Sequence, residues 1–319
     1  MFCLHSSLEE EDVLLILTSK ALMKNVILLN EKYQRCSFYI DATFKLMNNG
    51  FVLLTLGTET INHNFLLIAC AISAHENTNS YKQFLLSIKN GYKSIFNFTW
   101  QPTFVVSDAA DSISNSLETV FPNIAHIRCF FHASKAVKDK MTRWKDLEEK
   151  KLLKENLGLI NYGMRLLHQT TSDENFMDLW KLIEKEWSSK LPKAFLKYFD
   201  KNFVENRKKL RWNRMNYLGL NLTNNGIERL HGDLKATYTE KKKLKINEFL
   251  LVCSKFIRDY SIDYEEKVTS SIEKSIAVWK KAFLLLENKE RGPFYNIKDD
   301  CALFIKKKRK VSDLIERKR

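Results

Sequence analysis

The sequence predicts an α/β fold in which a mixed sheet is followed by a long helical segment. Three runs rich in β-branched and aromatic residues follow each other closely from residue 37, with short turn signals between them. Helix-spaced and strand-like runs then alternate as far as residue 131, giving the order β-β-β-α-β-α-β. From Ala133 to Leu220 there is no strand-like run, and aromatic residues recur at helical spacing. We interpret that aromatic stripe as a helical core.

Composition and charge narrow the class of function. The chain has 319 residues, 45% of them hydrophobic, which excludes a mainly disordered protein and allows one large domain or two smaller ones. Lysine and arginine exceed aspartate and glutamate by 52 − 38 = 14 charges. This basic balance indicates a polyanionic partner, most often nucleic acid. A basic protein without such a partner is the open alternative.

The N-terminal region and the cysteines indicate an intracellular, soluble protein. The acidic run Glu9–Asp12 follows the first apolar residues, which is the wrong order for a signal peptide. Apolar runs are shorter than the roughly 20 residues that a membrane-spanning helix needs, so we expect no membrane association. The six cysteines are scattered, and we expect them to be reduced and mostly buried: Cys3, Cys36, Cys70, Cys129, Cys253 and Cys301.

The first part of the predicted sheet is an antiparallel meander. Residues 8–30, which begin with acidic residues and carry an apolar stripe, are expected to form one or two helices before it. The first strand, Ser37–Lys45, contains Asp41 at its middle. Asn48–Gly50 is a strong hairpin signal, and strands at residues 51–57 and 65–72 complete the meander.

The second part of the sheet places a carboxylate at a strand end. A helix over Ser80–Phe96 leads to the apolar run Phe104–Val106, which ends at Asp108. Carboxylates at the C-terminal ends of buried strands are where α/β sheets usually carry their chemistry. Asp41 and Asp108 would lie side by side if the first and fourth strands are neighbours. The alternative is that Asp41 caps a turn and Asp108 caps the next helix.

A third polar group follows the helical segment. Thr223, Asn224 and Asn225 are residues typical of helix N-caps. In a helix that starts there, one face carries a polar row at spacings of i, i+4, i+7 and i+11, consisting of Asn224, Glu228, His231 and Lys235. Taken alone, this row is also what a solvated helix face looks like.

Together these motifs resemble the Mutator-like element (MULE) transposase family. The series is Asp41 in YIDATFK, Asp108 in VVSDAADS, the CFFH that contains Cys129 and His132, and Glu228 in NNGIERLH. Their order and the interval of 228 − 108 = 120 residues agree with that family. The resemblance implies a ribonuclease H-like mixed sheet, interrupted by an all-helical insertion before the last catalytic helix. It also implies a catalytic DDE triad of Asp41, Asp108 and Glu228.

On this basis the chain divides into five parts. We expect an N-terminal helical segment, a first part of the core, an all-helical insertion, a second part of the core with C-terminal helices, and a basic tail. Their bounds are residues 1–35, 36–134, 135–220, 221–290 and 291–319. The carboxylates Asp111 and Asp233 compete with the triad, but the first suits a helix cap and the second lies off the Glu228 face.

The resemblance also implies the cofactor and the residues around it. Asp41, Asp108 and Glu228 would hold two Mg²⁺ or Mn²⁺ ions, because hard carboxylate oxygens suit these cations. Residues expected to handle DNA or support the site are Cys129, His132, Asn224, His231 and Lys235. We do not expect zinc at Cys129 and His132, since no second pair of zinc ligands is evident.

The expected function is metal-dependent cleavage of double-stranded DNA at transposon ends and strand transfer into target DNA, by a homo-oligomer in the nucleus. The run Lys306, Lys307, Lys308, Arg309 and Lys310 resembles a nuclear localisation signal. Family members usually carry an N-terminal zinc finger, whereas only Cys3 and His5 precede the core here. A domesticated or decayed relative that binds DNA and regulates transcription without cutting is therefore the alternative. An unrelated nuclease with the same fold is a third reading.

Overall fold

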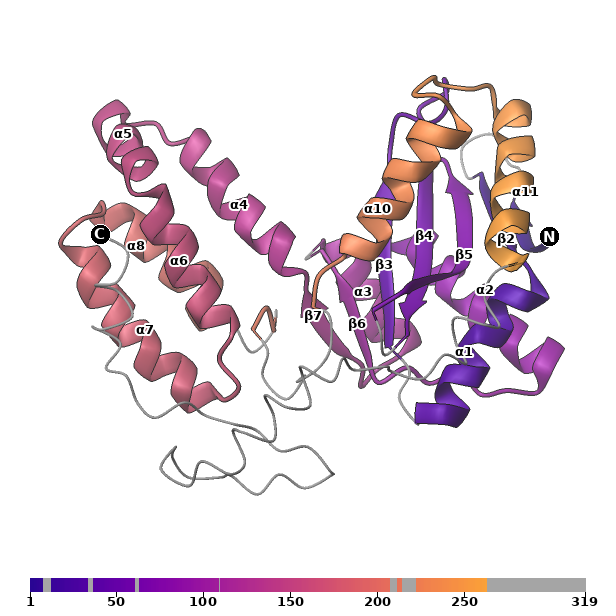
Figure 1. Ribbon diagram of the computed structural model, residues 1–319, viewed down its shortest axis with the longest axis horizontal. Coiled ribbons are helices and arrows are strands. Elements are labelled where there is room, and N and C mark those ends of the chain that lie inside the picture. The colour runs from indigo at the N-terminus through magenta and orange to yellow at the C-terminus, as the bar shows by residue number, and fades with distance from the viewer. Residues whose placement is uncertain are drawn as a thin grey trace, which may run out of the picture. The chain divides into compact units, whose positions relative to one another are not determined.

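A seven-stranded mixed sheet is the framework of the α/β part of the chain (Figure 1). The computed structural model describes residues 1–7, 13–33, 37–60, 63–108, 110–206, 211–213 and 222–262, all of which lie in the first of two compact units, Met1–Ser270. The strands are β1 (Phe2–Ser7), β2 (Leu14–Thr18), β3 (Ser37–Thr43), β4 (Val52–Glu59), β5 (Phe65–Ser73), β6 (Phe104–Ser107) and β7 (Ala125–Arg128). Their order across the sheet is β1-β2-β5-β4-β3-β6-β7.

Pairing within the sheet follows the predicted meander and crossovers. β3, β4 and β5 pair in antiparallel fashion, whereas β6 is parallel to both β3 and β7. The first and fourth predicted strands are therefore neighbours, and the predicted order from β3 to β7 is confirmed. The α/β class with a mixed sheet is thereby confirmed as well.

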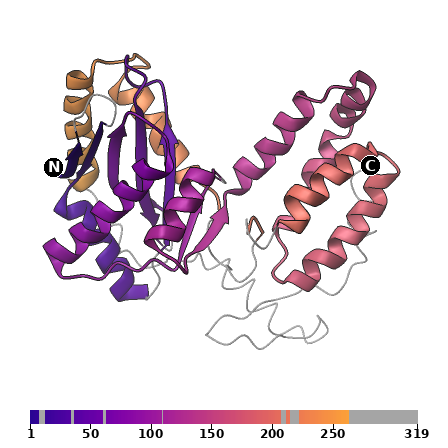
Figure 2. The same cartoon turned by 180° about the vertical axis from the view of Figure 1, so that it is seen from behind.

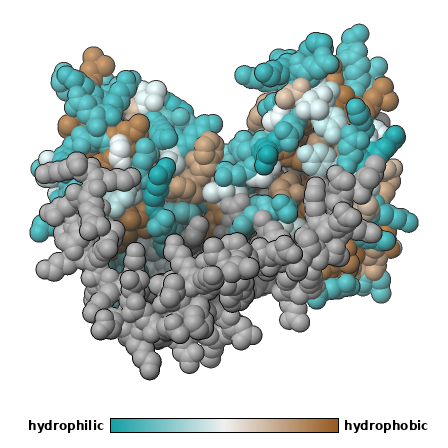
Figure 3. All heavy atoms as spheres, in the orientation of Figure 1, coloured by the Kyte–Doolittle hydropathy of each residue, from teal (hydrophilic) through white to brown (hydrophobic). Residues whose placement is uncertain are grey.

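Helices precede, interrupt and follow the sheet. They are α1 (Lys20–Tyr33), α2 (Thr78–Phe96), α3 (Asp111–Val120), α4 (Phe130–Thr142), α5 (Leu147–Glu155), α6 (Leu157–His168), α7 (Asp173–Ser188), α8 (Lys193–Phe199), the π-helix η1 (Asp200–Glu205), α10 (Asn225–Asp233), the π-helix η2 (Leu234–Tyr238) and α11 (Ile246–Ile262). None of them is long and apolar enough to cross a membrane within the residues described. Hydrophilic side chains dominate the described surface in Figure 3, with smaller hydrophobic patches between them.

Two separate cores cover the two faces of the sheet. On one face, α2 and α3 pack against Phe38, Ile40 and Val105, and Trp100 anchors an aromatic cluster there. On the other face lie α10 and α11, whose apolar residues pack against β4 and β5. Figures 1 and 2 show α10 and the pair α2 and α3 on opposite sides of the sheet. Successive residues of a strand therefore face different helices, and Asp41 shares the α10 face with Tyr39.

Helices α4 to α8 enclose a core of their own. Seven large aromatic residues form most of it: Phe176, Trp180, Trp187, Phe195, Phe199, Phe203 and Trp212. Their rings pack edge to face or stacked, for example Trp187 against Phe199 with centroids 5.0 Å apart. The interpretation of the aromatic stripe as core is confirmed for these seven side chains, which are buried, whereas Trp144, Tyr162 and Tyr198 of the same stripe are only partly buried.

The N-terminal segment differs from its prediction. The expected helix over residues 8–30 is wrong in its first part, because Leu14–Thr18 is strand β2, and β1 was not expected. β2 pairs with β1 on one side and β5 on the other, so all its backbone groups find ladder partners. Short leucine-rich runs fit either a buried strand or a helix, and pairing decides between them. Helix α1 begins only at Lys20.

The cysteines agree with a reduced protein. Cys3, Cys70, Cys129 and Cys253 are free, and all but Cys3 are buried. Cys36, Cys301, the predicted C-terminal helices beyond residue 262 and the basic tail lie outside the described residues.

Two glycines give a test of the packing. Gly57 lies in β4, where an added Cβ would overlap the ring of Phe65 and come within 2.8 Å of the Leu66 carbonyl oxygen. We expect Gly57→Ala to destabilise the fold by about 1–3 kcal/mol, seen as a fall in Tm of roughly 3–8 °C by calorimetry. As a control, Gly158→Ala meets nothing within 4 Å on helix α6 and should leave Tm unchanged or raise it. Equal falls in both variants would contradict the packing described for Gly57.

Candidate active site

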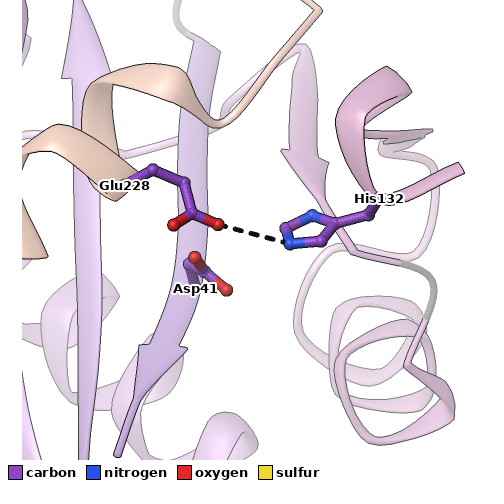
Figure 4. Close-up of side chains that lie close together, drawn as sticks. All are labelled: Asp41, His132 and Glu228. Carbon is purple, nitrogen blue, oxygen red and sulfur yellow. Dashed lines mark ion pairs between the residues drawn. The ribbon is translucent and has the colours of Figure 1, made fainter. Parts of the chain in front are cut away.

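Three side chains from distant parts of the chain converge beside the sheet (Figure 4). Asp41 comes from β3, His132 from the first turn of α4 and Glu228 from the first turn of α10. One ligand atom from each lies within 4.8 Å of the other two, and His132 Nε2 is 3.4 Å from Glu228 Oε1. Two carboxylates and an imidazole at this spacing form a possible metal site.

Asp108 lies at the same edge of the sheet, next to Asp41. Tyr39 on β3 pairs with Val106 on β6, and two residues further along each strand come Asp41 and Asp108. Residues paired across parallel strands point to the same face. Asp108 Oδ1 accepts a local hydrogen bond from the Ala110 amide at 3.2 Å, but the N-cap of α3 is Ala110 and no side chain caps that helix, so the helix-cap alternative is wrong for Asp108. Asp108 is not part of the 4.8 Å group in the described chain, although its charge acts on Asp41.

The N-terminus of α10 is fixed to the sheet and to α4 by Asn224. This residue occupies the N-cap position as predicted, but its side chain does not cap the helix. Instead, Asn224 Nδ2 donates to the Ile40 carbonyl oxygen at 3.3 Å, and the Asn224 backbone N–H donates to Cys129 Sγ at 3.2 Å. Asn224 is fully buried, so these bonds determine where α10 starts.

His231 lies one further turn along α10 and faces the sheet. Its Nε2 is 2.9 Å from Thr55 Oγ1, and its Nδ1 is 3.9 Å from Asp41 Oδ2. Burial, and secondarily the charge of Lys235, lowers the pKa of His231 to about 3, so the ring is neutral near pH 7 and does not form an ion pair with Asp41. The alternative of a solvated helix face is therefore wrong for Asn224 and His231. Lys235 falls in η2, beyond the end of α10.

The CFFH motif links the starts of two helices. β7 ends at Arg128, Cys129 is the N-cap of α4, and His132 lies in its first turn, so the expected strand up to residue 131 is too long. Cys129 bonds to Asn224 and His132 contacts Glu228, so two residues on α4 meet two residues on α10. The Cys129 thiol is buried, and burial raises its pKa.

The electrostatics of Asp41 are unusual for a carboxylate. Burial, together with the charges of Glu228, Asp108 and Glu76, raises the pKa of Asp41 to about 8, although a hydrogen bond from the Ala42 backbone opposes the rise. Without a cation, the folded protein therefore holds a proton on Asp41 near neutral pH. A carboxylate buried among other carboxylates is costly unless a positive charge joins it.

This donor set fits a hard divalent cation. Asp41 and Glu228 offer carboxylate oxygens, which Mg²⁺ and Mn²⁺ prefer, and Asp108 adds another at the same edge. Glu228 has 45% of its side chain exposed, so the site is open to a substrate as well as to an ion. A cation here would replace the proton on Asp41 and neutralise the carboxylates. The buried Cys129 thiol accepts a hydrogen bond from the Asn224 amide and is not one of the three ligands of this group.

Comparison with known families shows what this part of the chain is similar to. Residues 37–136 match the family model described as MULE transposase domain. The chain contains a MULE transposase domain. The resemblance to the MULE transposase family is thereby confirmed, and with it a transposase-related function that implies interaction with DNA. No curated protein matches the chain in a sequence search.

The matched segment runs from β3 into α4. It includes Asp41, Asp108, Cys129 and His132, whereas Glu228 and the rest of α10 lie beyond it. Glu228 is linked to the MULE transposase domain by geometry, since its carboxylate meets Asp41 and His132. Lys306 to Lys310 lie outside the described residues.

One acidic residue at this edge was missed by the sequence analysis. Glu76 follows β5, whose C-terminal end lies at the same edge of the sheet as those of β3 and β6. Tyr81 Oη donates to Glu76 Oε1 at 2.9 Å, and the charge of Glu76 contributes to the raised pKa of Asp41. A carboxylate just after a buried strand was the available signal, the same one that pointed to Asp108.

A polar network supports the loop that carries Asp108. Ser107 Oγ donates to the Asp108 carbonyl oxygen at 2.6 Å and lies 2.6 Å from His126 Nε2. His126 Nδ1 is 3.3 Å from Ser114 Oγ, on α3. Burial lowers the pKa of His126, so a neutral ring joins the end of β6 to the start of α3. This network restricts where Asp108 can lie.

The raised pKa of Asp41 leads to a stability prediction. Between about pH 4 and pH 8 the folded state keeps a proton that the unfolded state has lost, so this residue makes stability fall as pH rises through that range. With a chelator present to remove divalent cations, we expect the free energy of unfolding of Asp41→Asn at pH 8.5 to exceed that of wild type by on the order of 2–5 kcal/mol. The difference should shrink as the pH is lowered to 5.

Thermal melts at several pH values would measure this difference. Asp233→Asn is the matched control, because Asp233 is an exposed carboxylate on the same helix as Glu228. It should show no comparable dependence on pH. A constant difference between Asp41→Asn and wild type at every pH would contradict the electrostatic account of Asp41.

Proposed function

We propose that the protein is a MULE-type DDE transposase that cuts DNA at element ends and joins the 3′-hydroxyls to target DNA. In this proposal the α/β sheet is a ribonuclease H-like core, and Asp41, Asp108 and Glu228 are its catalytic carboxylates. The observation that carries it is the meeting of Asp41 and Glu228, which come from opposite sides of a long helical insertion. The adjacency of β3 and β6 supports the place of Asp108 beside them.

Each carboxylate has a separate task in this proposal. Two Mg²⁺ or Mn²⁺ ions, when bound, generate a nucleophile from water or a 3′-hydroxyl at neutral pH and neutralise charge on the scissile phosphate. Asp41 would help to hold both ions, since the charges of Glu228 and Asp108 both act on it. Asp108 and Glu228 would each hold one ion.

The neighbouring residues orient these carboxylates. His231 is fixed by Thr55 and, because it is neutral, lies beside Asp41 without competing for its charge. His132 contacts Glu228 Oε1 and favours one orientation of a side chain that is otherwise half exposed. Asn224 and Cys129 set the start of α10 and so the height of Glu228 above the sheet.

The substrate and its setting follow from the same proposal. The partner would be double-stranded DNA, both transposon ends and target, bound by a homo-oligomer in the nucleus. The formal charge of +14 supports a polyanionic partner. The exposed lysines Lys241, Lys242 and Lys243, which follow η2, add positive charge beyond the helix that carries Glu228. Lys306 to Lys310 would direct the protein to the nucleus.

Cleavage of a labelled duplex in Mn²⁺ tests the proposal. We expect Asp108→Asn and Glu228→Gln to lower the cleavage rate more than about 100-fold, because losing even the outer partners of a metal ligand costs 10–100-fold. Asp111→Asn is the control, since Asp111 is an exposed carboxylate in the first turn of α3. This variant should cleave the duplex at the wild-type rate.

DNA affinity measured in parallel separates the two candidate functions. Equal DNA binding by wild type and Asp108→Asn, with no cleavage by either in Mn²⁺, would overturn the transposase proposal in favour of a non-catalytic DNA-binding regulator. Cleavage without any joining of 3′-hydroxyls to a second duplex would indicate a nuclease instead.

A further inference from the structure

Arg128 is a positively charged residue at the edge of the site that the catalytic proposal does not use. It is the last residue of β7, and it pairs in the sheet with Ser107, the residue just before Asp108. Arg128 therefore lies at the C-terminal edge of the strands, where Asp41 and Asp108 also lie.

The guanidinium of Arg128 has no anionic partner among the residues that the structure describes. Its Nε–H is buried and donates to no hydrogen-bonding group there. The guanidinium lies over the face of Phe203 in η1, with Cζ 5.3 Å from the ring centroid, and it also interacts electrostatically with Tyr198. A buried donor left without a partner is destabilising, so the free protein carries an unfavourable group at this point.

A structural role does not account for this arrangement. The contact with the ring does not by itself require an arginine, because a lysine can also lie over an aromatic face. Arg128 is not a counter-ion of Asp108 by contact, because the two form no ion pair among the described residues. The charge of Asp108 acts on Arg128 only at longer range. Burial lowers the pKa of Arg128, which shows that the charged form is poorly compensated.

We propose that Arg128 binds a phosphate group of the DNA strand that enters the site beside Asp108. This inference rests on the proposed function, because it needs DNA at the carboxylate edge. A guanidinium presents a planar fork of N–H donors that matches the oxygens of a phosphate, and it stays charged when partly buried. The ring of Phe203 packs against the guanidinium and occupies none of its N–H donors. Phosphate binding would then supply the missing partner.

The salt dependence of DNA affinity counts phosphate contacts and tests this inference. The logarithm of the binding constant falls with the logarithm of the salt concentration, with a slope of about 0.9 for each phosphate contacted on duplex DNA. Binding of a fluorescent duplex in Ca²⁺ avoids any need for cleavage. We expect Arg128→Met to reduce the slope by about 0.9 and to weaken binding roughly 10-fold or more.

Three further variants make the result specific. Arg128→Lys keeps the charge and should keep the slope, while binding more weakly than wild type because the fork is lost. Phe203→Leu removes the ring and should keep the slope too. Lys93→Met removes one exposed charge at the end of α2 and should leave both slope and affinity close to those of wild type.

Stability separates phosphate binding from a structural role. Replacing an uncompensated buried charge with an apolar side chain is often neutral or stabilising, so Arg128→Met should keep or raise the Tm of the free protein. An unchanged slope in Arg128→Met would overturn the inference. So would a lower Tm in Arg128→Met together with a loss of affinity in Phe203→Leu as large as that in Arg128→Met. Absence of cleavage in Mn²⁺ would overturn the proposed function alone. Absence of salt-dependent DNA binding in wild type would overturn both.

Discussion

The site depends on how the first turn of α10 is attached to the start of α4 and to β3. The backbone of Asn224 donates to the Cys129 thiol, and its side chain donates to the Ile40 carbonyl oxygen. One turn later Glu228 meets His132. Cys129 and His132 are three residues apart on one helix, and Asn224 and Glu228 are four apart on the other, so each pair spans about one helical turn. The two turns therefore match, and this match brings Glu228 to Asp41 after the chain has passed through the whole helical insertion.

Asp41 shows what this arrangement costs the folded protein. It is only 8% exposed, and burial together with three carboxylates raises its pKa to about 8. Such a residue is unfavourable in the folded state at neutral pH, and the rest of the domain must offset it. The two sheet cores and the hydrogen bond of His231 to Thr55 keep the backbone around Asp41 fixed in spite of that cost. Protonation of Asp41 and occupation by a cation are two ways of relieving the same excess of negative charge.

Sequence patterns predicted those parts of the fold that depend on local chemistry. Strand-like runs located β3 to β7 and put Asp41 within the first of them and Asp108 at the end of the fourth. Whether those two strands are neighbours stayed a condition in the sequence, and the pairing of β3 with β6 fulfils it. The pattern could not decide β2, since Leu14–Thr18 becomes a strand only through partners on both sides. It also could not decide whether the polar row of α10 is buried, because a row of Asn, Glu and His is equally typical of a solvent-exposed helix face. Only tertiary packing decides that Asn224 and His231 are buried. The approach of His132 to Glu228 has no counterpart in sequence, because it depends on how two helices begin in space.

The helical insertion has a core of its own, and that makes its connections to the sheet informative. Its aromatic residues pack mainly with one another, so the insertion does not need the sheet to bury its hydrophobic surface. The two meet at the point where β7 gives way to α4: Phe130 stacks on His168 with centroids 4.2 Å apart, and the Phe130 amide donates to the Leu222 carbonyl oxygen. Arg128 and Phe203 make contact at the same junction. The residues that join the insertion to the core are thus immediate sequence neighbours of Cys129 and His132, which position α10. A displacement of the insertion would therefore act directly on the start of α4 and, through His132, on Glu228.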